Sequence, residues 1–594
     1  MDFSAGGRII SVTGGEGKFQ YKVEHLYSDQ GVDYIRFSKH ANKAHYPDPV
    51  TLSWKHPAVD IHGYWDPTAN RDKGLRIDFS EPSASKATFS APVFSLYNSA
   101  GANRLTVALS DALRPMQFRV GIHEESAQFE VWIKLFTEAS PQMTDYEVIM
   151  RVDTRNMFYA ESLREVSGWW EGLPGYTPSH VPEAAYQPMY STWYSFHQQV
   201  DPDEIERQCL LAKELGCETV IVDDGWQTAN DERGYAFCGD WQVSPERITD
   251  MKQFVDRVHQ LGMKFMLWYS VPFVGVHSQA WKRFEGKYIN TYGGKDTAVL
   301  DPRFPEVREY LIHTYEQALN VWGIDGFKLD FVDSFLLSED MRFSGGEGRD
   351  YDSVPEAVDR LLTDVMARLR AIKPNVMIEF RQNYIGPLMR KYGNMFRVAD
   401  CPNHHNQNRI GSLDIRLLSG NTAVHSDMMM WNKGDLDENV ALQFIHSLFS
   451  VPQISVRLDE IPETHQQVAA YWLAFWKEHR SLLLEGTLRP MSPEMMYPIV
   501  YAYHDNDWLA AVYGENFVAS MDRTVSGSYW LVNGTSQDRL IVNWTEAASN
   551  LRMIVRNCYG LTVKDEIVTM KQGAHVLEVP PSGLIEMTHV AAQG

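Results

Sequence analysis

The strongest constraint on this chain is a regular alternation of strand-like and helix-like segments after residue 188. Short apolar runs alternate there with amphipathic stretches of helical length, several of which begin at Asp or Pro and end at Gly, as helix caps require. Eight strands, each followed by a helix, over about 290 residues match a (β/α)8 barrel. The predicted strands span residues 189–196, 218–226, 263–270, 324–331, 375–381, 395–400, 422–427 and 451–456.

A doubly wound sheet is the competing architecture for such an alternation. That fold would carry a glycine-rich phosphate-binding loop after its first strand. The sequence contains neither G-x-G-x-x-G after a strand nor G-x-x-x-x-G-K-[ST]. The barrel is therefore the prediction.

The segments on either side of the barrel have a different texture. Short runs with period-two alternation, separated by turn residues, fill the first ~170 residues and return after residue 484, which is typical of β-sandwiches. Four prolines at 174, 178, 182 and 188 mark a stiff boundary. We predict a multidomain α/β protein with an N-terminal β-sandwich at 1–175, a central TIM barrel at 176–484 and a C-terminal antiparallel β-sandwich at 485–594.

Composition excludes several classes of function. The 55 basic and 77 acidic residues leave a net charge of −22, which argues against a nucleic-acid partner. No apolar run approaches the length of a membrane-spanning helix, so no membrane partner is expected. The five cysteines are odd in number and lack C-x-x-C spacing, which indicates reduced thiols. The opening segment does not resemble a secretion signal, so a cytoplasmic location is expected.

Catalytic groups of a TIM barrel lie at the carboxyl ends of its strands. Several carboxylates, a few cations and several indoles occupy those positions here. Carboxylates accept hydrogen bonds from vicinal hydroxyls, indoles stack on the C–H face of a sugar, and two carboxylates can hydrolyse a glycoside. A carbohydrate ligand is therefore expected. The candidates, in chain order, are Trp193, Asp223, Asp224, Trp226, Trp268, Lys328, Asp330, Arg381, Arg397, Asp400 and Asp427.

Two other reaction classes are disfavoured. The chain has no H-x-H on the first strand and no H-E-x-x-H, and the adjacent rings of His404 and His405 cannot easily turn to one ion. G-x-S-x-G is absent too, which disfavours a serine hydrolase. We expect neither a metal nor another cofactor. A metal-dependent hydrolase and a non-catalytic sugar-binding protein remain as alternatives.

Several motifs resemble the glycoside hydrolase family 36 α-galactosidases (melibiase-like), which are distantly related to families 27 and 31. The resemblance covers the barrel well and the terminal domains in texture only. It rests on IVDDGWQ (221–227), LDPRFPEVREYL (300–311), GIDGFKLDF (323–331), FRVADCPN (396–403) and FWKEHRSLL (475–483).

This resemblance implies a retaining exo-glycosidase that hydrolyses small α-galactosides by double displacement. Asp330 matches the nucleophile and Asp400 the acid/base, which must be partly protonated at the working pH. Lys328 would keep Asp330 ionised. Asp223 and Asp224 match residues that bind the sugar hydroxyls, and Trp268 corresponds to the aromatic floor of the sugar site. The family also implies dimers or tetramers.

One loop departs from the family pattern. After the fifth strand the family usually has E-S-C-S-G-G-G, whereas this chain has bulky residues from Glu379 to Tyr384, with Arg381 among them. Arg397 also stands three residues before Asp400, where relatives often place an arginine four before. We expect the bulky loop residues to narrow the site and to add a cation. An α-glycosidase or transglycosylase for another sugar (N-acetylgalactosamine, glucose or an acidic sugar) is therefore the main alternative.

Overall fold

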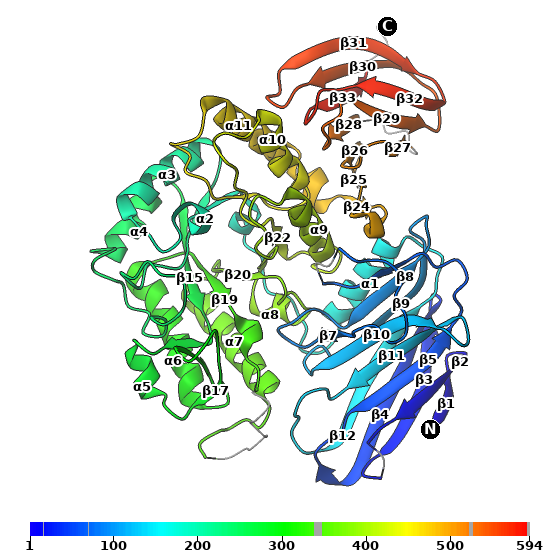
Figure 1. The fold of residues 1–594 in the computed structure, drawn as a ribbon, viewed down its shortest axis with the longest axis vertical. Coiled ribbons are helices and arrows are strands. Elements are labelled where there is room, and N and C mark those ends of the chain that lie inside the picture. Colours follow the sequence, from blue (N-terminus) through cyan, green and yellow to red (C-terminus); the bar gives the residue numbers. More distant parts are fainter. Residues whose placement is uncertain (16, 69–70, 338–346, 522–526, 591–594) are drawn as a thin grey trace.

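The computed structural model describes residues 1–15, 17–68, 71–337, 347–521 and 527–590. A barrel of strands and helices lies beside an N-terminal domain of sheets, and a C-terminal domain of sheets lies against both (Figure 1). This arrangement confirms the predicted fold class. Among the described residues, no helix combines the length and the apolar character needed to cross a membrane.

The barrel strands confirm the eight predicted positions. Within the described residues they form one sheet in the order β22-β21-β20-β19-β15-β14-β13-β23, with every neighbouring pair parallel. A parallel bridge between His425 and Val451 brings the two ends of this sheet together. The strands are β13 (Met189–Ser191), β14 (Thr219–Val222), β15 (Lys264–Ser270), β19 (Gly326–Asp330), β20 (Met377–Arg381), β21 (Met395–Arg397), β22 (Ala423–His425) and β23 (Gln453–Ile454).

Methionines fill one end of the barrel interior. Met189, Met266, Met377 and Met395 are fully buried in one cluster with Ile221. Their flexible side chains fill irregular space between converging strands. The charged candidates lie towards the other end of the same strands, so the apolar layer closes the barrel beneath them.

Local sequence sets where the barrel helices begin. Asp201 accepts hydrogen bonds from the N–H groups of Asp203 (3.0 Å) and Glu204 (3.1 Å), and Asp250 caps the next helix in the same way. Such caps stabilise a helix by about 1 kcal/mol each. The helices are α2 (Trp193–Phe196), α3 (Pro202–Glu214), α4 (Met251–Gln260), α6 (Pro305–Gln317), α7 (Val354–Ile372), α8 (Met389–Tyr392), α9 (His405–Arg416), α10 (Asp437–His446) and α11 (Glu463–Glu478).

Two local features differ from the predicted pattern. The first strand ends at Ser191, and Trp193 opens the short helix α2 rather than continuing the strand. An unpredicted excursion follows the third barrel strand and contacts the carboxyl end of the fourth, where the rings of Phe273 and Phe331 lie 4.8 Å apart. It contains β16 (Phe273–Gly275), α5 (Gln279–Arg283), β17 (Tyr288–Thr291) and β18 (Thr297–Leu300).

The N-terminal domain is a sandwich of two antiparallel sheets, each six-stranded within the described residues. Both sheets contribute to one core that includes Leu52, Val131, Phe37 and Leu105. The first sheet has β1 (Asp2–Ala5), β2 (Arg8–Thr13), β5 (Val50–His56), β11 (Gln128–Leu135), β10 (Met116–His123) and β7 (Ser83–Ser85). The second has β3 (Gln20–Asp29), β4 (Val32–His45), β12 (Met143–Asp153), β9 (Asn103–Leu109), β8 (Val93–Tyr97) and β6 (Gly63–Trp65).

The C-terminal domain also consists of two sheets around one core. Its pairs are antiparallel except β26–β28 and β27–β29, which are parallel, so the predicted antiparallel character holds for most of the domain. The strands are β24 (Thr487–Pro490), β25 (Ile499–His504), β26 (Asp507–Val512), β27 (Val518–Met521), β28 (Ser528–Asn533), β29 (Arg539–Trp544), β30 (Ala548–Arg556), β31 (Thr562–Met570), β32 (Gly573–Glu578) and β33 (Leu584–His589).

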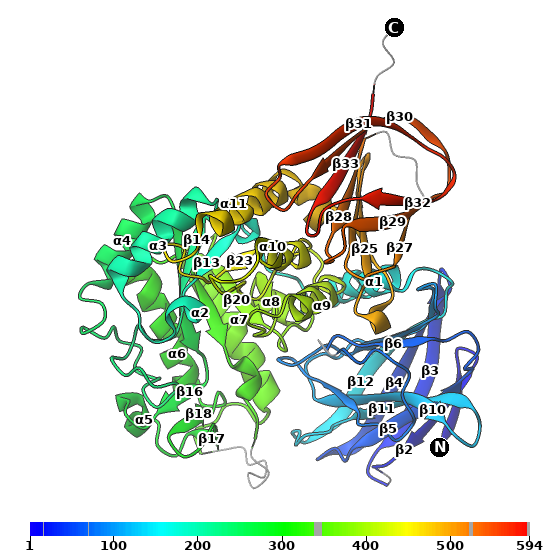
Figure 2. The ribbon, with the colours of Figure 1, turned by 45° about the horizontal axis from the view of Figure 1, so that its top comes forward.

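Helix α1 (Tyr159–Glu171) joins the three parts of the molecule, and Figure 2 shows it between the N-terminal and C-terminal sheets. The Tyr159 hydroxyl donates to the carbonyl of Pro490 at 2.9 Å. Ser167 donates to the carbonyl of Leu418, in the barrel, also at 2.9 Å. The division at residues 175 and 484 stays our proposal for the domain limits.

Candidate active site

Asp330 ends β19 at the carboxyl edge of the barrel, and only 6% of the residue is exposed. Its Oδ1 accepts hydrogen bonds from Nε of Arg381 at 2.8 Å, from the Tyr384 hydroxyl and from the N–H of Phe331 at 2.9 Å. Its Oδ2 accepts one from Nε1 of Trp268 at 3.1 Å. One carboxylate oxygen is therefore held by three donors and the other by a single indole.

The surroundings of Asp330 favour its ionised form. Burial by itself raises the pKa of this carboxyl, but the charges of Arg381 and Lys328, with the hydrogen bonds from Tyr384 and Trp268, lower the pKa well below its usual value. The Arg381 guanidinium also lies 5.2 Å from the ring centre of Phe331. Arg381 therefore lowers the pKa of Asp330 at least as much as Lys328, the cation predicted for this role.

Lys328 joins the fourth strand to the second. Its Nζ donates to Oδ2 of Asp223 at 2.6 Å, and both residues are almost completely buried. Asp224, the next residue, accepts from the amide groups of Gln227 (2.6 Å) and Gln198 (3.1 Å) instead. Burial, with a smaller contribution from the charge of Asp223, raises the pKa of Asp224 to about 6. The two adjacent aspartates therefore have different partners, a cation for Asp223 and neutral amides for Asp224.

The D-D-G-W motif requires its glycine. Gly225 has a φ of 115°, and a Cβ at this position would lie 2.5 Å from Cα of Gln198. Only glycine allows that close approach at a positive φ. The turn thereby brings the Gln198 amide to Asp224.

Arg397 is fully buried among three acidic side chains on neighbouring strand ends. It donates to Oδ1 of Asp427 and, at 2.9 Å, to Oδ1 of Asp400, and its Nε lies 3.5 Å from Oε1 of Glu379. Asp427 is fully buried, whereas 49% of the Asp400 side chain is exposed. Arg397 therefore links the fifth, sixth and seventh strands beneath Asp400.

The expectation of a partly protonated Asp400 is not met by the protein alone. Burial raises the pKa of this carboxyl, but the charges of Arg397, Lys328 and Arg381 outweigh it, so the pKa is lowered. Raised values occur deeper in the site, where burial raises the pKa of Asp427 to about 6. Asp400, which is exposed enough to face a ligand, therefore has a lower pKa than the buried Asp427.

An aromatic wall borders Asp330. The ring of Trp268 stacks with that of Tyr235 at 6.2 Å, and Tyr235 contacts Phe331 at 4.9 Å and Tyr292 at 5.8 Å. Burial and the charges of Asp330 and Asp224 raise the pKa of the Tyr235 hydroxyl. The role of Trp268 as an aromatic floor stays a prediction.

Two predicted ligand contacts lie elsewhere. Trp226 is fully buried, and its indole N–H donates to the carbonyl of Trp268 at 3.0 Å, so it supports that strand from the core. The oxygens of Asp427 are occupied by Arg397, by the N–H of Cys401 (2.6 Å) and by the Tyr194 hydroxyl (2.9 Å). Asp427 therefore positions Arg397.

Trp193 is partly exposed on the helix α2, with its ring 4.7 Å from that of His197. Its contact with a ligand stays a prediction. Sequence reasoning did not select Tyr384, Gln198 or Gln227. Tyr384 could have been found, because it belongs to the loop that departs from the family pattern. Gln198 has no sequence signal, because its approach to Asp224 depends on the turn at Gly225.

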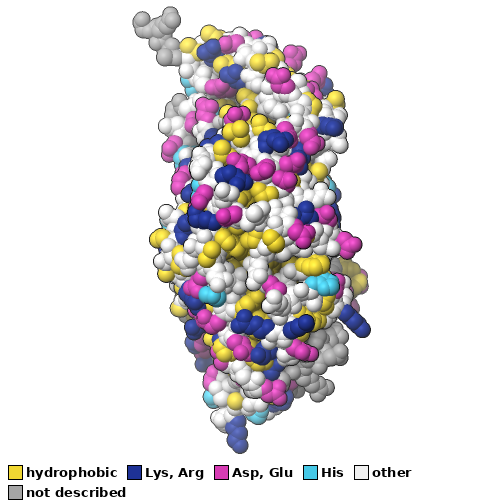
Figure 3. Space-filling view, turned by 90° about the vertical axis from the view of Figure 1, so that its left-hand side faces the viewer, with side chains coloured by type: hydrophobic (Ala, Val, Ile, Leu, Met, Phe, Trp, Pro, Cys, Tyr) yellow, Lys and Arg dark blue, Asp and Glu magenta, His cyan; other side chains and the backbone are white. Residues whose placement is uncertain are grey.

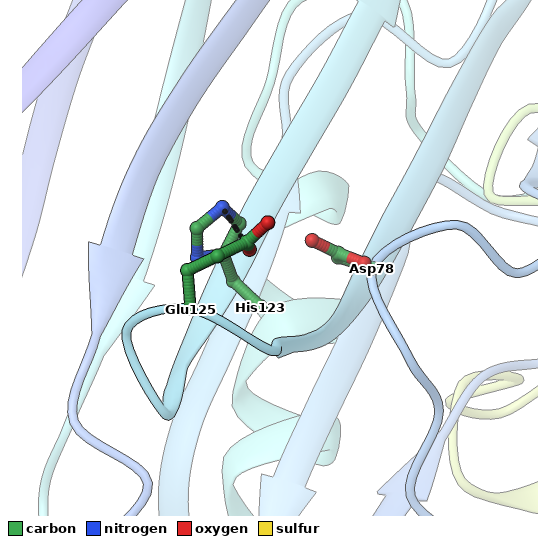
Figure 4. Close-up of side chains that lie close together, drawn as sticks. All are labelled: Asp78, His123 and Glu125. Carbon is green, nitrogen blue, oxygen red and sulfur yellow. Dashed lines mark ion pairs between the residues drawn. The ribbon is translucent and has the colours of Figure 1, made fainter.

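Asp78, His123 and Glu125 form a separate cluster of metal-ligand side chains on the N-terminal domain (Figure 4). One ligand atom from each lies within 4.8 Å of the others. His123 is already paired with Glu125 at 3.1 Å, and 80% of the Glu125 side chain is exposed. The cluster lies on the N-terminal sandwich and contributes no residue to the barrel mouth.

The barrel resembles a family of known proteins. Residues 184–417 match the family model described as Melibiase. The barrel is melibiase-like. The matched stretch runs from just before β13 to the end of α9, so it contains Asp223, Lys328, Asp330 and Asp400 but ends before Asp427.

Three relatives match parts of the chain. The chain is 26% identical over 206 residues to an α-galactosidase of Escherichia coli, covering 33% of this chain and 28% of that one. It is 26% identical over 150 residues to the α-galactosidase Mel36A of Lactobacillus acidophilus, covering 24% and 20%. It is 24% identical over 195 residues to the A type blood α-D-galactosamine galactosaminidase of Flavonifractor plautii, covering 28% and 17%. The chain thus matches less than a third of each relative's length.

Solved structures share the whole melibiase-like architecture. The α-galactosidase AgaA of Geobacillus stearothermophilus superposes with a TM-score of 0.62 at 14% identity, covering 98% of this chain and 83% of that one. The α-galactosidase of Lactobacillus brevis gives 0.61 at 14% identity, covering 99% and 86%. The fold therefore extends to both terminal domains.

Proposed function

We propose that this chain is a retaining exo-α-glycosidase that releases terminal α-linked galactose from small α-galactosides. The observation that carries the proposal is Asp330, a buried carboxylate kept ionised by Arg381 and Lys328 at the carboxyl edge of a melibiase-like barrel. An AgaA structure from Geobacillus stearothermophilus holds raffinose, which supports a carbohydrate ligand in this fold. No cofactor takes part in the proposed reaction.

The proposed reaction has two displacements. Oδ2 of Asp330 attacks the anomeric carbon while Asp400 protonates the departing glycosidic oxygen, and a covalent glycosyl-enzyme forms. Asp400 then takes a proton from water, which attacks the same carbon and releases Asp330. Arg381 and Tyr384 hold Oδ1 throughout, so they leave Oδ2 as the attacking atom.

The sugar is held by the second and third strands in this proposal. Asp223 and Asp224 accept hydrogen bonds from its hydroxyl groups, and the Trp268 and Tyr235 rings cover its C–H face. Asp223 accepts from the Lys328 ammonium, whereas Asp224 accepts from neutral amides. A bound galactose hydroxyl would replace an amide donor at Asp224.

A second candidate substrate class is favoured by the fifth-strand loop. Oδ1 of Asp330 already accepts three hydrogen bonds, so it has little capacity left for a 2-hydroxyl of the sugar. Arg381 uses Nε and Nη1, and its Nη2 donates to none of the described residues. A 2-acetamido sugar would offer this nitrogen a carbonyl oxygen. The Flavonifractor plautii relative is named for α-D-galactosamine, which carries nitrogen at the 2-position, and it supports testing sugars substituted there.

A panel of nitrophenyl α-glycosides of galactose, N-acetylgalactosamine and glucose tests the proposal. We expect hydrolysis of the α-galactoside to be fastest, with the α-anomer as the first product by proton NMR. A higher kcat/KM on the acetamido substrate would favour the second candidate. No hydrolysis of any member would favour a sugar-binding protein, and loss of activity to a chelator would favour a metal-dependent hydrolase.

We further propose a cytoplasmic location and a dimer or tetramer, without nucleic-acid or membrane partners. The five cysteines of the described chain are all unpaired and buried, as in proteins of reducing compartments. Size-exclusion chromatography with light scattering measures the assembly state directly. A monomer at micromolar concentration would contradict that part of the proposal.

A further inference from the structure

A cavity of about 950 Å³ lies on the outer flank of the barrel, apart from the residues around Asp330. Helices α5 and α6 form its sides, and the segment 240–243 forms its inner wall. Figure 3 shows the side of the molecule on which these helices lie, where acidic, basic and hydrophobic side chains are interspersed. A cavity of this size is within the range of small-ligand sites.

Two tryptophans line this cavity, and each is presented by an unusual backbone. Trp241 has a φ of 52°, a left-handed conformation that is costly for a bulky residue. Trp322 is the last residue of a π-helical turn, η2 (Ala318–Trp322). Strained residues and π-helical turns are concentrated at functional sites. Two such features converging on one cavity indicate that its shape is functional.

Hydrogen bonds connect the segments that form the walls of the cavity. The Tyr310 hydroxyl of α6 donates to the carbonyl of Gly239 at 2.6 Å. Asp240 accepts from the N–H groups of Gln279 and Ala280 in α5, both at 2.8 Å. The segment between the helices is therefore fixed to both of them. Such a site exists before a ligand binds, which reduces the entropic cost of binding.

The polar groups at the rim suit a neutral ligand with many hydroxyls. Arg283 lies 4.8 Å over the Tyr310 ring and forms no ion pair with the described residues. Gln317 contacts His313 at 3.0 Å, and both side chains are exposed. Two of the acidic side chains that line the cavity form ion pairs, Glu306 with Lys287 and Glu309 with Arg368. The cavity therefore offers hydrogen-bonding groups and aromatic surface without excess charge.

We propose that this flank cavity is a second carbohydrate site, which binds a short neutral oligosaccharide without cleaving it. The partly exposed Trp322 ring would contact a C–H face of the sugar, and the buried Trp241 would remain part of the inner wall. Arg283, His313 and Gln317 would bond to hydroxyls. Trp241 also contacts Trp268 at 6.0 Å, and the Trp268 indole donates to Asp330. A ligand here would therefore lie one aromatic layer behind the wall of the barrel site.

Calorimetric titration with raffinose, maltotriose, cellotriose and xylotriose tests this site in an Asp330→Asn background, which prevents the proposed hydrolysis. At about 10 mM ligand, a Kd near 1 mM is measurable. We expect at least one probe to bind. Arg283→Ala should weaken that binding about tenfold, whereas Lys282→Ala, the adjacent exposed cation outside the cavity, should not change it.

A second pair of variants, at Trp322, tests the site without changing its net charge. Trp322→Phe should retain more binding than Trp322→Ala, with both melting temperatures measured to confirm folding. In the active protein, Arg283→Ala should leave hydrolysis of nitrophenyl glycosides unchanged. No binding by any probe, or binding unaffected by both Arg283→Ala and Trp322→Ala, would overturn the proposal. Binding is read directly, so the absence of hydrolysis by the barrel would not alter either outcome.

Discussion

The carboxylates on the two sides of the barrel mouth differ in burial and in the number of hydrogen-bond donors around them. At the ends of β19 and β20, Asp330 is buried and accepts hydrogen bonds from four donors. At the end of β21, the Asp400 side chain is half exposed and accepts from Arg397. The first arrangement fixes a charge and its orientation. The second leaves one carboxyl able to exchange protons with substrate and water.

This difference matches what two carboxylates must do in a retaining reaction. A nucleophile gains from a fixed geometry, because the attacking atom must be aligned with the anomeric carbon. An acid/base must gain and lose a proton in each cycle, so a rigid set of donors would oppose its function. The following changes test whether the two sides divide the work in this way.

The largest effect is expected from Asp330→Asn. Asparagine keeps the shape but cannot form the glycosyl ester, so kcat/KM should fall by at least about 10⁴-fold. Steady-state kinetics with a nitrophenyl α-galactoside, and circular dichroism to confirm folding, provide the measurement. Asp333→Asn is the matched control, because Asp333 lies on the adjacent turn η3 (Val332–Ser334). Equal losses in the two variants would contradict the assignment.

Asp400→Ala should produce a loss that depends on the leaving group. Without a general acid, hydrolysis of unactivated galactosides should fall by about 10²–10⁴-fold. Glycosyl fluorides need no protonation, so they should lose far less, and azide should restore turnover. Because the pKa of Asp400 is lowered, wild-type activity should rise as the pH falls below neutrality, and this rise should vanish in the variant. Equal losses on fluorides and galactosides would contradict the role.

The sequence predicted which strand ends meet at the mouth but not how the charges of their side chains are set. The eight strand positions follow from local alternation, and parallel strands share one carboxyl edge, so Asp223, Asp330 and Asp400 had to come together. The pKa of Asp400 is lowered because Arg397, three residues earlier, donates a hydrogen bond to its carboxylate. That contact depends on the conformation of the turn between them, which the sequence does not specify. Trp226 was predicted to contact a ligand, but its indole donates to the carbonyl of Trp268 in the core. The sequence does not indicate whether the side chain of a turn residue points to the core or to the mouth.

Tyr384→Phe tests how far the nucleophile depends on fixed donors. The change removes one hydrogen bond to Oδ1 of Asp330, and kcat should fall by about 10²–10³-fold with little change in KM. The acidic limb of the pH profile should move upward, because loss of a donor raises the pKa of Asp330. Tyr292→Phe is the control, since Tyr292 contacts Phe331 at 5.6 Å without bonding to Asp330. An unchanged profile in Tyr384→Phe would show that Arg381 and Lys328 suffice.

The smallest effect is expected within the D-D-G-W motif, where paired and unpaired carboxylates are adjacent. Burial raises the pKa of Asp224 from 3.8 to about 6, so the stability that its protonated form contributes is fully present below pH 3.8 and is lost as the pH rises through 6. Asp224→Asn should therefore increase the free energy of unfolding at pH 7 by about 1–2 kcal/mol.

Urea denaturation at pH 7 and at pH 4 measures this change, and the gain should disappear at the lower pH. Asp223→Asn is the opposing control, because it leaves the buried Lys328 charge without its partner and should destabilise the protein. Opposite signs for two adjacent, isosteric substitutions would show that the partner of each carboxylate, rather than its burial, sets its energetic role. Stabilisation by both would contradict the role of Asp223 as the required partner of a buried Lys328 charge.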